Sequence, residues 1–199
     1  MQRFQKILIK DAKTFPFPRI DFTTPAAKRA AQLEKAKRLY EKSLADGDVQ
    51  NALRFVEAEL QAGRADVVHD LLAFLAERMM AMNAQKRTTA KQFLTDLKDF
   101  HSIEARALNP KTKLDQFWKL EATDVFAHLR KNTKLLTAQN VRLTEDGEEK
   151  IRARFSKAKS TLVPLDTQIA LTDGLIDEIV FRLYGLTPEE TALIQTRTP

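Results

Sequence analysis

The sequence has 199 residues, 43% of them hydrophobic and 30% charged, which is the composition of a folded chain and excludes a wholly disordered one. Its net charge is +6 and it has no cysteine, so disulfide bonds, thiolate nucleophiles and cysteine-based zinc sites are excluded. No apolar run approaches the roughly 20 residues that a membrane helix needs, and the first residues lack the apolar core of a signal peptide. We therefore expect a cytoplasmic protein with no membrane partner.

Residues 1–22 differ in pattern from the rest of the chain. A short β-like stretch at 5–10 is followed by Phe15-Pro16-Phe17-Pro18. Prolines at alternate positions fix φ and bias the preceding residues away from helix. The sequence therefore predicts two parts, an extended Pro-containing segment at 1–22 and a helical module at 23–199.

Helical signals begin directly after this segment. Thr24-Pro25 predicts a helix start with Thr24 as the cap, and Gly63 predicts the end of the following helix. Apolar residues then recur at helical spacing from 67 to 100, which predicts one helix of more than thirty residues with a polar middle at 83–89. Such a long helix is typical of an antiparallel hairpin or a coiled-coil-like arm.

The remainder of the chain predicts shorter helices. Asn109-Pro110 ends the long helix, and residues 111–140 predict a helical pair. A helix capped by Thr144 comes next, and Pro164 is predicted to start a further helix that ends at Gly185. Thr187 and Glu190 form a capping box for the last helix.

Few glycines and many alanines, leucines, lysines and glutamates favour helix. Together with the periodicity, this composition predicts a mainly α fold. We expect an elongated helical bundle or hairpin with a long central helix and a short extended N-terminal segment.

Residues for catalysis are scarce. The three histidines lie far apart and match no metal-ligand spacing, and no glycine-rich loop exists to hold a nucleotide or cofactor. Glu148-Glu149-Lys150 matches half of a metal-dependent nuclease signature but lacks an upstream Asp on a strand. Asn109-Pro110 matches only the first two residues of the adenine-methylase motif that holds a flipped base. We predict no catalytic, cofactor-binding or metal-binding residue in this chain.

Basic residues cluster in three places, and residues 128–160 hold nine Lys or Arg against four Asp or Glu. Each cluster is compatible with DNA phosphate contacts and equally with an ordinary solvated helix face. The candidate DNA-binding residues are Lys86, Arg87, Lys91, Arg130, Lys131, Lys134, Arg152, Arg154, Lys157 and Lys159.

The stretch 171–190 contains Ile176-Asp177, Val180, the run Leu-Tyr-Gly-Leu-Thr at 183–187, and Glu190. This pattern resembles the ending of type II restriction-modification N6-adenine DNA methyltransferases, the single-chain restriction and methylation enzymes. Residues 15–20 resemble their Pro-rich strand at the end of target recognition, residues 68–86 the long helix after it, and residues 164–172 the entry to the final helix.

The resemblance implies a non-catalytic C-terminal module that braces target recognition on DNA through backbone phosphate contacts. Its partners would be double-stranded DNA and a catalytic methyltransferase domain or subunit. S-adenosylmethionine and Mg are then expected only in upstream domains that this sequence lacks, so the chain alone would be no enzyme. The alternative is a helical protein-interaction or oligomerisation module without DNA contact, in which the long helix is the arm of a homodimer.

Overall fold

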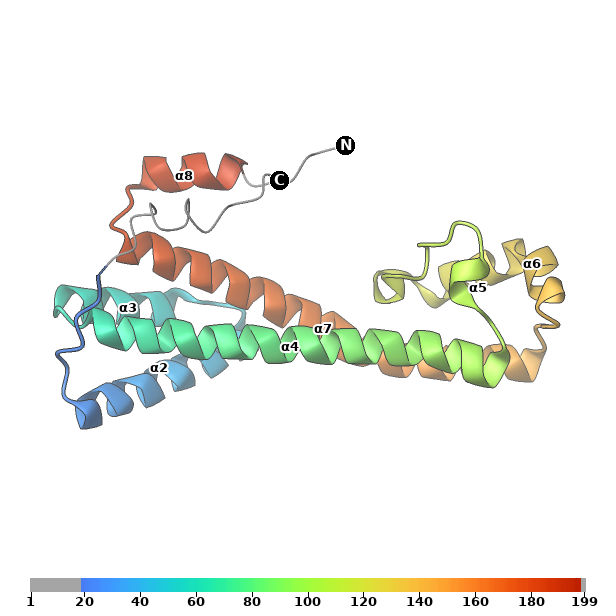
Figure 1. Ribbon diagram of the computed structural model, residues 1–199, viewed down its shortest axis with the longest axis horizontal. Coiled ribbons are helices and arrows are strands. Elements are labelled where there is room, and N and C mark those ends of the chain that lie inside the picture. The colour runs from blue at the N-terminus through green and yellow to red at the C-terminus, as the bar shows by residue number, and fades with distance from the viewer. Residues whose placement is uncertain (1–18, 198–199) are drawn as a thin grey trace. The chain divides into compact units, whose positions relative to one another are not determined.

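The computed structural model describes residues 19–197, and within this range the chain is helical with no strand (Figure 1). The predicted mainly α class is confirmed. Most of the predicted extended segment 1–22 lies outside the described residues, and Arg19–Phe22 belong to no helix or strand. The helices are α2 (Ala26–Asp46), α3 (Gln50–Gln61), α4 (Ala65–His101), α5 (Ala122–Lys131), α6 (Thr133–Ala138), α7 (Glu145–Leu183) and α8 (Pro188–Arg197), with 3-10 turns η1 (Ala105–Ala107) and η2 (Phe117–Lys119).

Several predicted helix ends are confirmed. Gly63 and Gly185 have φ of 69° and 64°, left-handed values that glycine adopts without strain just beyond a helix end. At the start of α8 the Thr187 amide donates to Glu190 at 2.9 Å, and the Glu190 amide donates to the Thr187 hydroxyl at 3.3 Å. The long helix is also confirmed, because α4 has 37 residues.

Three local predictions were wrong. Asn109-Pro110 does not end the long helix, because α4 ends earlier, at His101, and Ser102 after it has a left-handed φ of 55°. Pro164 does not start a helix, because it lies inside the 39-residue α7. Thr24 does not cap α2: the N-cap position is Pro25, with no side-chain cap, and the Thr24 hydroxyl donates to Asp66 instead. At Pro164 and Thr24 the packing of distant segments overrode a local preference.

None of the described helices combines the length and the apolarity needed to cross a bilayer. The contacts divide the chain into two units, which we call the terminal unit (Met1–Ala73 with Leu175–Pro199) and the central unit (Phe74–Gly174). Each unit has its own buried apolar side chains.

In the terminal unit, α2 and α3 pack through Tyr40, Leu53 and Val56, all nearly or completely buried. The first turns of α4 add Val67 and Leu71 to this apolar core. Residue spacing of three and four places these side chains on one face of each helix.

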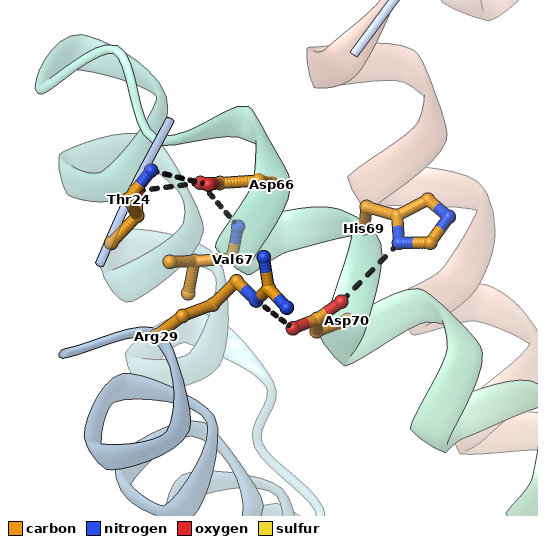
Figure 2. Close-up of polar contacts among 6 residues, drawn as sticks. All are labelled: Thr24, Arg29, Asp66, Val67, His69 and Asp70. Atoms are coloured by element: carbon orange, nitrogen blue, oxygen red, sulfur yellow. Dashed lines mark hydrogen bonds and ion pairs between the residues drawn. The ribbon is translucent and has the colours of Figure 1, made fainter. Parts of the chain in front are cut away.

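A polar cluster fixes the start of α4 in the terminal unit (Figure 2). The fully buried Asp66 carboxylate accepts hydrogen bonds from the Thr24 amide at 2.8 Å, the Thr24 hydroxyl at 2.7 Å and the Val67 amide at 2.9 Å. One turn later, Asp70 pairs with Arg29 at 2.8 Å and lies 3.4 Å from the His69 ring nitrogen. These contacts tie Thr24, before α2, and Arg29, in the first turn of α2, to the first two turns of α4.

In the central unit, α4 and α7 lie side by side and antiparallel (Figure 1). Lys86 of α4 pairs with Asp166 of α7, and Asp96 further along α4 pairs with Arg154 earlier in α7. Buried residues of α7 recur at 151, 155, 158, 162 and 165, a seven-residue repeat typical of coiled-coil packing. The η1–α6 region completes the core with apolar residues such as Phe117, Trp118 and Phe126.

Candidate nucleic-acid interface

All ten candidate DNA-binding residues belong to the central unit. This unit has eighteen Lys or Arg against thirteen Asp or Glu, so it carries a net charge of +5 out of the +6 of the whole chain. A surface that attracts phosphates is therefore expected on the central unit rather than on the terminal unit.

Four of the ten cations are held by carboxylates of the same unit. An ion pair neutralises part of the charge and orders the side chain, so these four have less charge to offer an external anion. The pairs are Lys86 with Asp166 at 2.5 Å, Arg130 with Glu148 at 2.6 Å, Arg154 with Asp96 at 3.1 Å and Lys159 with Glu121 at 2.9 Å.

Two arginines of α7 also lie over aromatic rings. The Arg152 guanidinium carbon is 4.7 Å from the centre of the Phe126 ring, and that of Arg154 is 4.1 Å from the centre of the exposed Phe100 ring. A cation over the face of an aromatic ring is attracted by its negative π surface. These arginines therefore have a packing role within the unit.

The side chains of the other five candidates are exposed and form no ion pair or hydrogen bond with another residue in the described range. All five remain available to an external anion, which makes them the best candidates for phosphate contact. They are Arg87 and Lys91 on α4, Lys131 at the end of α5, Lys134 on α6 and Lys157 on α7.

A groove of about 370 Å³ lies between α4 and α7 and is lined by one of these cations, Lys157. Thr88 and Gln92 line it from α4, one residue after Arg87 and Lys91 respectively, and Lys157 and Thr161 line it from α7. Hydroxyl and amide groups next to cations are typical of surfaces that contact a phosphate backbone.

A cluster of Trp118, Asp166 and Lys86 stabilises the packing of the central unit. The Trp118 indole N–H donates to Asp166 at 2.7 Å, and Lys86 pairs with the other carboxylate oxygen. Burial raises the pKa of the Asp166 carboxyl, but the hydrogen bonds from Lys86 and Trp118 outweigh burial and leave the pKa lowered. The charge of Lys86 is therefore largely neutralised by Asp166.

Comparison with known proteins gives a family. A family model described as "Domain of unknown function (DUF8810)" matches residues 68–180, more than half of the chain. The chain belongs to this family. The matched range includes the whole central unit and twelve residues of the terminal unit, 68–73 and 175–180. No curated protein and no solved structure matches the chain.

In this DUF8810 chain, sequence reasoning missed four further cations of the central unit. All four are exposed and form no ion pair in the described part of the chain; they are Lys111, Lys113, Lys119 and Arg142. All lie outside the α-helices, and therefore outside the helical periodicity that drew attention to the clusters. A simple count of cations per unit would have included them.

The nuclease-like fragment of the DUF8810 chain lies within α7. Glu148 pairs with Arg130, and Lys150 donates to Asp146 at 2.7 Å. Across residues 19–197, no three His, Asp or Glu side chains gather as ligands for a metal ion.

Proposed function

We propose that the chain is a non-catalytic module that binds double-stranded DNA through its phosphate backbone, with the central unit as the contact surface. The observation that carries this proposal is the set of five exposed cations without a partner, Arg87, Lys91, Lys131, Lys134 and Lys157, in a unit with a net charge of +5. Contacts of this kind fix position and orientation on DNA and do not read sequence.

The resemblance of residues 171–190 to restriction-modification adenine methyltransferases adds a partner to this proposal. A catalytic methyltransferase domain or subunit would bind S-adenosylmethionine and Mg and carry out the chemistry. The present chain would brace target recognition and hold that partner on the duplex. The description of the DUF8810 family assigns no activity, so the methyltransferase partner stays a prediction.

The salt dependence of DNA binding tests the proposal. Fluorescence anisotropy of a labelled duplex of random sequence, titrated with the chain at several salt concentrations, gives the slope of log K against log salt. Each phosphate contact contributes about 0.9 to this slope because it releases a counterion. The triple variant Arg87→Gln, Lys91→Gln, Lys157→Gln is expected to reduce the slope by about 2 to 3 units.

A matched control removes the same charge from the terminal unit. Lys28, Arg38 and Arg54 are exposed and have no ion pair within residues 19–197, so their triple Gln variant is expected to leave the slope nearly unchanged. Equal losses in both variants would mean a nonspecific effect of net charge. Absence of binding even at low salt would refute DNA contact by this chain.

An interaction module without DNA contact is the second candidate, and exposed apolar side chains of the central unit favour it. Met80 and Val163 are 66% and 43% exposed on α4 and α7. Apolar groups on a helix surface are suited to a partner helix or a second copy of the chain. Light scattering across a range of concentrations separates the two candidates, because a constant monomeric mass together with DNA binding leaves only the first.

A further inference from the structure

A shallow hollow of about 330 Å³ lies beside α5 in the central unit, apart from the groove between α4 and α7. The proline of the Asn109-Pro110 loop and residues of α5 surround it. Its lining residues are Pro110, Lys113, Asp124, Ala127, His128 and Lys131.

His128 is the unusual member of this lining. Only 6% of its surface is exposed, and its Nε2 is buried without a hydrogen-bond partner. Its carbonyl oxygen accepts a hydrogen bond from the Asn132 side chain at 2.8 Å, so the backbone at this point is satisfied while the ring is not. A buried polar group without a partner costs free energy, and its retention calls for an explanation.

Two lysines bring positive charge to the same hollow. Lys113 and Lys131 are exposed and pair with no carboxylate within the described range. Burial, and then the charges of these two lysines, lower the pKa of His128. The one acidic side chain in the lining, Asp124, accepts a hydrogen bond at 3.3 Å from the Glu121 amide, which it caps.

We propose that this hollow is a phosphate-binding subsite. A phosphate group of a nucleic-acid backbone would lie between Lys113 and Lys131, where its negative charge would act on the neighbouring His128 imidazole. The apolar surfaces of Pro110 and Ala127 suit the adjoining sugar. This inference rests on the proposed function and adds a defined anion site to it, with Lys113 and His128 as members that the helical pattern did not indicate.

The test is a histidine titration of the full chain by NMR, in the presence of inorganic phosphate and, separately, of a short duplex. Chloride at equal ionic strength is the reference. An anion that binds better to the protonated ring must raise the pKa of His128, by about one unit if it binds roughly tenfold more tightly to the imidazolium. His69, in the terminal unit, is the internal control and should not respond.

The double variant Lys113→Gln, Lys131→Gln should abolish the rise that phosphate causes at His128. The Arg87, Lys91 and Lys157 triple variant should retain it. The subsite proposal is overturned if phosphate does not raise the pKa of His128, or if it raises this pKa equally in the double variant. If inorganic phosphate raises the pKa of His128 but the chain does not bind duplex DNA, the hollow is a phosphate site and the proposed function is rejected. If the chain binds DNA and the pKa of His128 does not change, only the subsite is rejected.

Discussion

At the scale of single residues, Asp66 illustrates how hydrogen bonds stabilise a buried carboxylate. Burial raises the pKa of its carboxyl, but hydrogen bonds from the Thr24 hydroxyl, the Thr24 amide and the Val67 amide outweigh burial and leave the pKa lowered. Since the folded pKa lies below the unfolded one, this group stabilises the fold above about pH 4. That contribution is lost as the pH falls through the folded pKa.

Replacement of Thr24 by Val tests this account. The change keeps the shape and the backbone amide donor but removes the hydroxyl that donates to Asp66 at 2.7 Å. We expect a loss of about 1 to 3 kcal/mol in the free energy of unfolding at pH 7, measured by urea denaturation, and a smaller loss below pH 4. The exposed Thr23→Val variant is the control, and equal losses in the two variants would contradict a special role for the hydroxyl.

Residue identities along the chain could not reveal this partnership, because Thr24 and Asp66 are 42 residues apart. The sequence did indicate Thr24 as a helix cap, which is its commonest use before a proline. The same limit applies to the cationic surface. Sequence shows where Lys86 and Lys91 lie on a helix, but only the fold shows that Asp166 neutralises Lys86 while Lys91 has no described partner.

At the scale of elements, α7 continues through a residue that ordinarily starts or breaks a helix. Pro164 lacks the amide that would donate to the preceding turn, yet the helix extends on both sides of it. Buried Leu162 and Leu165 flank Pro164 in the chain, so packing of the apolar stripe favours an unbroken helix. Caps and left-handed glycines at other ends were predictable because they depend on neighbouring residues alone, whereas this continuity depends on tertiary packing.

The Pro164→Ala variant is expected to be more stable than the natural chain. Proline in a helix interior costs about 3 kcal/mol relative to alanine, and the greater freedom of the unfolded variant offsets roughly 1 kcal/mol of that. A gain of about 2 kcal/mol should appear as a higher midpoint in thermal denaturation followed by circular dichroism. Pro25→Ala, at the start of α2 where proline is tolerated, should give no such gain. A loss of stability in Pro164→Ala would show that the proline has a packing role of its own.

At the scale of the whole molecule, the mainly α class followed from local periodicity, but the division into two units did not. The terminal unit joins segments from both parts of the chain, as in the ion pair of Arg182 with Glu57 across 125 positions at 2.9 Å. No periodicity in the sequence reports such a pairing. The positive charge of the chain was visible from the start, whereas its concentration in one unit became clear only with these contacts.

This concentration of charge predicts where DNA will act on the chain. In a backbone amide NMR spectrum of the full protein, addition of a short duplex should shift resonances of the central unit, most strongly around Lys91 and Lys157. Resonances of α2 and α3 should change little, because those helices belong to the other unit. If the largest shifts occur in α2 and α3, the contact surface lies on the terminal unit and this prediction is wrong.

Trp118, which donates to Asp166 in the central unit, is the only tryptophan in the sequence, while both tyrosines, Tyr40 and Tyr184, belong to the terminal unit. Each unit therefore has a fluorophore of its own kind. Selective excitation of the indole reports on the central unit alone, and tyrosine emission reports on the terminal unit. The natural chain thus contains built-in optical probes that show, without any label, whether its two units unfold together or one after the other.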